Sequence, residues 1–236
     1  MRLGIMQPYF FPYIGYFSLI KHTDRFILFD PVQFIRHGWI ERNRTLKQNE
    51  GWQYIQAPLV KHDQATLIKD IKINNTTDWK GKILAQIQHY KKKSPYYFAT
   101  LKVLNEIFSK EYDDIVSFNH TSLLKVCEYL GINTQMDIFS DMHLEIEPVN
   151  APDEWALNIC KAVDGTTEYW NPIGGTSFFD KTKYEKAGLN IQFQQMNLEP
   201  YDQNRETFEA GLSIIDVMMF NSPEEINKML DNYKLI

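Results

Sequence analysis

Two short apolar runs near the amino end constrain the fold of this chain more than any other feature. Arg2–Met6 and Arg25–Asp30 have the length and composition of buried strands. Between them, Pro12 suits the first turn of a helix, and Tyr13 to about Lys21 reads as that helix. A strand, a short helix and a second strand predict adjacent parallel strands joined by a right-handed crossover. We therefore expect an α/β fold with a mainly parallel sheet and a Rossmann-type βαβ start.

The remaining chain fits a single α/β domain that spans residues 1–236, because no linker rich in Gly, Ser or Pro divides it. Helical periodicity is concentrated at about 79–131, which we interpret as a helical insertion on the α/β base. Further strands are expected at 52–57, 67–73, 134–139 and 190–195, and helices at 79–90, 98–108, 121–130, 153–163, 213–220 and 223–233.

Composition and charge exclude several classes of protein. The net charge is −5, with 44% hydrophobic and 23% charged residues, which is typical of a globular domain and disfavours a basic groove for DNA. No apolar run is long enough for a signal peptide or a membrane helix, so we expect a cytoplasmic protein without membrane insertion. The six histidines and two cysteines have no metal-ligand spacing, and no metal site is predicted. Cofactor requirement and oligomeric state do not follow from these features.

The stretch from Gln7 to Phe17 (QPYFFPYIGYF) carries no charged residue, although it follows the first expected strand directly. Ligands bind at the carboxyl ends of strands in open parallel sheets, so this position favours a binding site. Tyrosines can stack on a ring and still form a hydrogen bond, and a glycine permits close backbone approach. The alternative is an aromatic cluster that seals the edge of the sheet. The predicted binding residues here are Gln7, Tyr9, Tyr13, Gly15 and Tyr16.

A second stretch, from Phe29 to Thr45, supplies the charge that the first one lacks. It follows the second expected strand, so it should lie beside the first stretch. Arginine is suited to bidentate contacts with phosphate or carboxylate groups. A solvated loop with surface ion pairs is the alternative. We predict proton transfer by His37 or Asp30, and ligand binding by Gln33, Arg36, Trp39, Arg42, Asn43 and Arg44.

A third stretch, Gly174-Gly175-Thr176-Ser177, precedes a short expected helix. Its backbone N–H groups could hold an anion, but it lacks the spacing and the lysine of a Walker loop. It is therefore a weak nucleotide signature, and a simple chain reversal is an equal alternative.

The first two stretches, together with LSIIDVMMFN near the end, resemble the WbqC-like family. The resemblance extends from Met6 to Asn221. It implies an enzyme of bacterial surface-polysaccharide (lipopolysaccharide O-antigen) synthesis that transfers an amino acid such as glycine onto an amino sugar. A nucleotide-linked amino sugar and an amino-acyl donor would then be the partners, with ATP as one candidate activator. The donor would be an adenylate made in the same site, an aminoacyl-tRNA or a thioester, and the acidic net charge weighs slightly against tRNA. The matching positions are Gln7, Pro8, Tyr9, Pro12, Gly15, Tyr16, Asp30, Gln33, Trp39, Arg42 and Asn43.

A weaker similarity points to the HIGH superfamily of nucleotidyltransferases and adenylate-forming ligases. Its members have a strand, a proline-containing loop and an H-x-G-H string that opens a helix. Tyr13-Ile14-Gly15-Tyr16 occupies that place here, with both histidines replaced by tyrosine. The alternative functions are therefore a HIGH-like nucleotidyltransferase or ligase with altered chemistry, and a non-catalytic nucleotide-sugar-binding protein.

Overall fold

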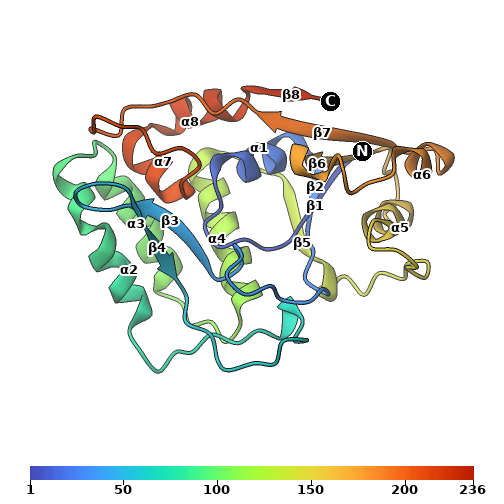
Figure 1. The fold of residues 1–236 in the computed structure, drawn as a ribbon, viewed down its shortest axis with the longest axis horizontal. Helices are drawn as coiled ribbons and strands as arrows, with labels where there is room; N and C mark the ends of the chain where they lie inside the picture. Colours follow the sequence, from blue (N-terminus) through green and yellow to red (C-terminus); the bar gives the residue numbers. More distant parts are fainter.

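A computed structural model describes residues 1–236, and a six-stranded sheet forms its centre (Figure 1). The strand order is β5-β2-β1-β6-β7-β8, and the first five strands run parallel. The α/β fold with a mainly parallel sheet is thus confirmed, and the two expected amino-terminal strands are paired neighbours. The strands are β1 (Arg2–Met6), β2 (Arg25–Leu28), β5 (Gln135–Ile138), β6 (Glu168–Pro172), β7 (Asn190–Met196) and the antiparallel β8 (Tyr233–Leu235).

Helices cover both faces of this sheet, and the alternation of side chains along each strand explains why. On β2, Phe26 and Leu28 pack into the larger core, whereas Ile27 between them packs into the smaller one. Gly4 on β1 leaves room for the Phe26 ring, which a side chain at that position would meet at 2.6 Å. The larger core includes α1 (Ile14–His22), α4 (Ile115–Leu130), α7 (Ile214–Phe220) and α8 (Pro223–Leu230); the smaller includes α5 (Glu154–Ala162) and α6 (Lys181–Lys186).

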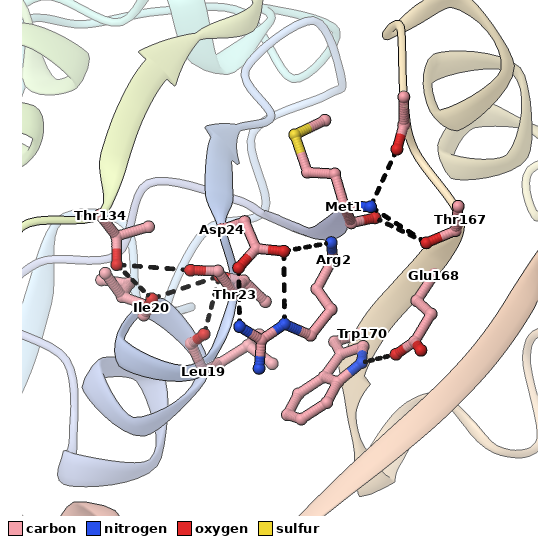
Figure 2. Close-up of polar contacts among 11 residues, drawn as sticks. Met1, Arg2, Leu19, Ile20, Thr23, Asp24, Thr134, Thr167, Glu168 and Trp170 are labelled. Atoms are coloured by element: carbon pink, nitrogen blue, oxygen red, sulfur yellow. Dashed lines mark hydrogen bonds and ion pairs between the residues drawn. The ribbon is translucent and has the colours of Figure 1, made fainter.

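The amino-terminal edge of the sheet is fixed by polar contacts that Figure 2 shows. Arg2 forms an ion pair with Asp24 (2.7 Å), which joins the start of β1 to the turn before β2. The amino group of Met1 donates to the Gly165 carbonyl (2.9 Å) and to the Thr167 hydroxyl (3.0 Å), so β1 is also tied to β6. These contacts lie at the amino-terminal edge, so they leave the opposite edge, where the carboxyl ends of the parallel strands lead into loops, unobstructed.

The chain between β2 and β5 holds more than the helices expected at about 79–131. It begins with an antiparallel hairpin of β3 (Arg42–Leu46) and β4 (Trp52–Gln56). The strand expected at 67–73 was wrong: the middle of this segment forms the short 3-10 helix η1 (Ile68–Asp70), and the residues on either side of it form only isolated bridges, such as Leu67 with Gln33 and Ile73 with Leu59. The other elements are α2 (Trp79–Ile87), η2 (Gln88–Lys92), α3 (Tyr97–Phe108) and α4. In Figure 1, α2, α3 and the hairpin lie on the opposite side of the molecule from α5 and α6.

The apolar segment LSIIDVMMFN contains α7, and all of its helical residues are buried. Asp216 within it accepts hydrogen bonds from the hydroxyls of Tyr90 (2.5 Å) and Tyr201 (2.5 Å) and from the Gln203 amide (3.0 Å). Burial raises the pKa of Asp216 to about 6. This cluster joins η2, α7 and the segment before α7 inside the core.

None of the helices combines the length and the apolar character that spanning a membrane would require.

Candidate functional site

The candidate site lies where the order of the sheet reverses. From β1 the chain crosses to β2 on one side, whereas β6 on the other side of β1 leads onward to β7. In open α/β sheets, ligands bind in the crevice outside the carboxyl ends of the strands at such a switch point. A cavity of about 1110 Å³ occupies this place. Residues from the ends of β1 and β6 line it, as do residues from the loop after β2 and from the start of α5.

The wall of this cavity contains no Asp, Glu, Lys, Arg or His side chain. Thirteen of its 21 lining residues are hydrophobic, and aromatic rings form much of the surface. These rings are Tyr9, Phe29, Trp155, Tyr169, Phe178 and Phe179. Nor do three His, Cys, Asp or Glu side chains gather anywhere in the chain in a group that could hold a metal ion. The cavity is therefore suited to an uncharged ligand surface with apolar faces.

The first residues of the uncharged opening stretch face this cavity. Gln7 and Tyr9 both line it and are half-buried. The Gln7 carbonyl accepts a hydrogen bond from the Tyr16 hydroxyl (2.8 Å), while the Gln7 amide forms no hydrogen bond within the protein. Burial raises the pKa of Tyr9, so its hydroxyl remains a neutral donor at physiological pH. Both side chains thus present free polar groups to a ligand.

The next residues turn into the core, which explains why the stretch can lack charge. Phe10 and Phe11 are fully buried and pack against Phe118 of α4. Their carbonyls accept hydrogen bonds from the Asn43 amide at 3.1 and 2.9 Å. A second amide, that of Asn119, donates to the Pro8 carbonyl (2.8 Å). The backbone of this loop is satisfied by neutral amides of the insertion, so it needs no water and no charge.

The three other predicted residues of this stretch have packing roles. Tyr16 is buried, and its ring contacts the rings of Phe17 and Phe26. Gly15 lies directly under the Tyr13 ring, where any side chain would clash with it. The structure therefore does not bring Tyr13, Gly15 and Tyr16 to the cavity that Gln7 and Tyr9 line. The glycine serves close packing of a ring and not the approach of a ligand.

Asp30 is also committed to the fold. One carboxylate oxygen accepts from the Ser140 backbone N–H (3.1 Å) and the other from the Ser140 hydroxyl (2.5 Å). Ser140 belongs to the 3-10 helix η3 (Phe139–Asp141), which follows β5, so the pair joins the ends of two neighbouring strands. Burial raises the pKa of Asp30 despite these hydrogen bonds. With both oxygens engaged and the side chain absent from the cavity wall, Asp30 is poorly placed to transfer a proton there.

The turn after β2 forms one side of the cavity mouth. Gln33 and Ile35 line the cavity, and Arg36 and His37 follow on the exposed surface. His37 has a positive φ of 63°, and its backbone is held on both sides. Its N–H donates to the Glu41 carboxylate (3.1 Å), and its carbonyl accepts from Arg42 (2.6 Å). The imidazole thus sits on a fixed turn two residues beyond the cavity wall.

The guanidinium groups of both arginines of β3 stack on aromatic rings. The guanidinium of Arg42 lies 4.1 Å from the centre of the Tyr54 ring, besides holding the His37 carbonyl. That of Arg44 lies between Trp39 (5.5 Å) and Trp52 (5.1 Å) and donates to the Gly211 carbonyl (3.2 Å). The prediction grouped Trp39, Arg42, Asn43 and Arg44 with the first stretch around one ligand, but none of these four lines the cavity.

Sequence reasoning missed the opposite wall of the cavity. Asn171 at the end of β6 is buried, and its amide N–H donates to the Tyr169 hydroxyl (2.6 Å). Its carbonyl oxygen lies against Gly175, so closely that any side chain at that position would displace it. The Gly-Gly pair of the third stretch does line the cavity, within the 3-10 helix η4 (Ile173–Gly175). The signal that was overlooked is an asparagine between an aromatic run and two glycines.

Comparison with known proteins places this architecture in a family. The model of the WbqC-like protein family matches residues 7–228. The chain belongs to the WbqC-like family. A protein of Mycobacterium tuberculosis, named Uncharacterized protein Rv1507c, is 27% identical over 223 residues, which make up 93% of each chain. No solved structure matches the chain.

The positions that carry the WbqC-like resemblance divide into two groups. Gln7, Tyr9 and Gln33 line the cavity. The others support the loops around it: Pro8, Pro12, Gly15, Tyr16, Asp30 and Asn43 are buried, while Trp39 and Arg42 stack on neighbouring side chains. In this member of the WbqC-like family, most of the motif supports the loops around the cavity and a smaller part lines it.

Proposed function

We propose that the protein forms an amide between an amino acid, such as glycine, and the amino group of a nucleotide-linked deoxy amino sugar. This reaction would serve the synthesis of a bacterial surface polysaccharide, the context that WbqC-like membership suggests. The observation that carries the proposal is the uncharged, aromatic cavity at the switch point of the sheet, with free amide groups in its wall.

In the proposed complex, the substrate lies in the cavity with its diphosphate toward the mouth. Arg36 follows the lining residue Ile35 and forms no ion pair, only a hydrogen bond to the His62 carbonyl (3.3 Å). Its guanidinium is thus available for a diphosphate at this position. Arg42 of β3 does not contact the substrate in this complex. It holds the turn that carries Arg36 and His37 through its hydrogen bond to the His37 carbonyl.

His37 is the proposed base that deprotonates the attacking amine. It follows the lining residue Ile35 by two positions on an exposed turn, and tyrosine is the only ionisable residue type in the cavity wall itself. The free amine attacks the acyl carbonyl and forms the new C–N bond, while the bond between the acyl carbon and the leaving group breaks and the leaving group takes the electron pair. The proton lost by the amine passes to the imidazole.

The reading as a HIGH-like nucleotidyltransferase receives less support from the geometry. Tyr16, which stands where that superfamily has its second histidine, is buried and donates to the Gln7 carbonyl. It therefore has no free group for a nucleotide phosphate.

The test is to incubate the protein with glycine and a nucleotide-linked sugar that has a free amine. Parallel reactions supply ATP, glycyl-tRNA or a glycyl thioester, and mass spectrometry detects the gain of one glycyl residue. We expect product with one of these donors, and ATP–pyrophosphate exchange with glycine would identify the adenylate route. Binding of the sugar nucleotide with no product from any donor would contradict the proposal and favour a non-catalytic binding protein.

A matched pair of variants tests the base. His37 and His143 are both exposed and both have a positive φ, of 63° and 49°, which asparagine tolerates. We expect His37→Asn to lower the turnover number about a hundredfold while KM changes little. His143→Asn lies in another loop and should leave both constants unchanged. Equal rates for the two variants would remove His37 from the reaction.

A further inference from the structure

The proposed substrate has several chemically distinct parts, and the cavity wall discriminates between them. A diphosphate, an amino acid or a free amine carries charge, and a buried charge needs a charged or metal partner. The wall offers no such partner, because tyrosine is its only ionisable residue type. Of the parts of a sugar nucleotide, only the base is neutral, planar and apolar on both faces.

A planar group in the cavity would meet mainly aromatic rings. Phe29 and Trp155 are in contact, with ring centres 5.3 Å apart, and both line the cavity. Phe178 lines it as well, and it is 52% exposed, an unusual state for a phenylalanine. Stacking on aromatic side chains is the common way in which proteins hold unpaired bases.

The polar groups of the wall match the edge of a base. The amides of Gln7 and Asn150 and the hydroxyl of Tyr9 form no hydrogen bond within the protein, although all three residues line the cavity. Asn171 donates its N–H to Tyr169, which fixes the amide and leaves its carbonyl oxygen as an acceptor. Amide groups of Asn and Gln pair with the donor and acceptor atoms of base edges.

Gly175 makes this acceptor possible. Because any side chain there would displace the Asn171 carbonyl oxygen, the glycine keeps that oxygen in place beside the loop. The orientation of the Asn171 amide thus depends on two contacts: its N–H group donates to Tyr169, and its oxygen occupies the space beside Gly175 that a side chain would otherwise fill.

We infer that the cavity is a nucleobase pocket: aromatic rings stack on the base, and Gln7, Tyr9, Asn150 and Asn171 contact its edge. This inference rests on the proposed function for the identity of the substrate, and it assigns the base to the cavity and the diphosphate to the mouth beside Arg36. It predicts that an uncharged nucleoside is sufficient for binding.

The experiment is calorimetric titration of the protein with uridine, thymidine, guanosine, cytidine and adenosine, and with ribose 5-phosphate as a probe without a base. We expect at least one nucleoside to bind, with an affinity that changes less than about twofold between low and high salt because no charge contacts it. Ribose 5-phosphate should not bind. Binding of ribose 5-phosphate with no binding of any nucleoside would overturn the inference, and so would no binding of any probe.

Two variants locate the binding. Gly175→Ala, which should displace the Asn171 oxygen, is expected to weaken nucleoside binding about tenfold, and Phe178→Ala about tenfold through lost stacking. Thr176→Ala changes the same loop at a residue outside the cavity wall and should bind as the unmodified protein does. Phe178 is exposed, so its variant folds and remains informative even if Gly175→Ala does not. Unchanged affinity in Phe178→Ala would overturn the assignment.

The outcome of these titrations can be distinguished from the outcome of the amide-formation assay. If amide product forms but no nucleoside binds, the proposed function stands and the nucleobase pocket is wrong. If a nucleoside binds and no donor yields product, the pocket stands and the proposed function fails.

Discussion

Two sets of amide side chains in this protein have the same chemistry and opposite surroundings. Asn43 in the core uses its whole amide: it donates to the carbonyls of Phe10 and Phe11 and accepts from the Arg44 N–H (2.8 Å). Gln7 and Asn150 at the cavity use none of theirs within the protein. The contrast separates polar groups that hold the fold together from polar groups that remain available to a ligand.

This difference has an energetic meaning. A buried polar group without a partner costs about 1–3 kcal/mol, so the core tolerates few of them. A cavity wall can keep free amides because water or a ligand satisfies them. Removal of a bonded core amide should therefore destabilise the fold, whereas removal of a free cavity amide should change binding alone.

The largest expected effect comes from Asn43→Ala. It removes the amide hydrogen bonds to the Phe10 and Phe11 carbonyls and leaves the buried Phe10 carbonyl without a partner, while the Phe11 carbonyl keeps the Ser213 hydroxyl (2.8 Å). We expect the free energy of unfolding to fall by about 2–4 kcal/mol, measured by urea denaturation. Asn150→Ala is the matched control and should change it by less than about 0.5 kcal/mol. Equal stability of the two variants would break the comparison.

Asp216 extends the comparison to a charged group with three internal donors. Burial raises the pKa of Asp216 to about 6 from an ordinary value of 3.8, so the folded state binds the proton more tightly than the unfolded state. This group contributes its full stability below about pH 3.8, and that stability is lost as the pH rises from there through about 6. The difference corresponds to about 3 kcal/mol.

The measurement is the free energy of unfolding of the protein and of Asp216→Asn between pH 4 and pH 7. The difference between the two curves isolates this carboxyl from all others. We expect the unmodified protein to lose stability relative to the variant as the pH rises. A gain in that window would mean that the three donors outweigh burial and that the pKa is lowered.

A smaller effect is expected from the tyrosines of the opening stretch. Tyr16→Phe loses the hydrogen bond to the Gln7 carbonyl and should cost about 1 kcal/mol of stability. Tyr9→Phe removes a hydroxyl without an internal partner and should cost less than about 0.5 kcal/mol. Thermal denaturation of both variants checks the order. The reverse order would place Tyr9 in the structural group.

The strands at the centre of the fold could be predicted from local patterns in the sequence, because burial on both faces makes each of them a continuous apolar run. The apolar runs at 2–6 and 25–30 could be read as strands since each is buried on both faces. β6 was missed because Asn171 and Pro172 interrupt its aromatic run, and β3 was missed because arginines occupy its outward positions. Pairing with neighbouring strands, which a single segment does not reveal, overrides these weak local preferences.

The candidate site was predicted in part, and for a comparable reason. Its position at the carboxyl end of β1 follows from topology, so Gln7 and Tyr9 could be found. Whether a residue faces the cavity or the core depends on contacts with distant segments. Tyr16 faces Phe26 and Asn43 faces Phe10, and neither contact has a signature in the local sequence. Asn171 and Trp155 come from segments more than a hundred residues away along the chain, so only the assembled sheet brings them to Gln7.

The central claim is that the uncharged cavity at the ends of β1 and β6 is the substrate site. Its most direct test is the equilibrium affinity of Gln7→Ala for a nucleotide-linked amino sugar. We predict binding weaker by roughly three- to tenfold, the value of one neutral hydrogen bond, with an unchanged urea midpoint. Unchanged affinity would contradict the claim, and unchanged affinity with a lowered urea midpoint would assign Gln7 to the structural group.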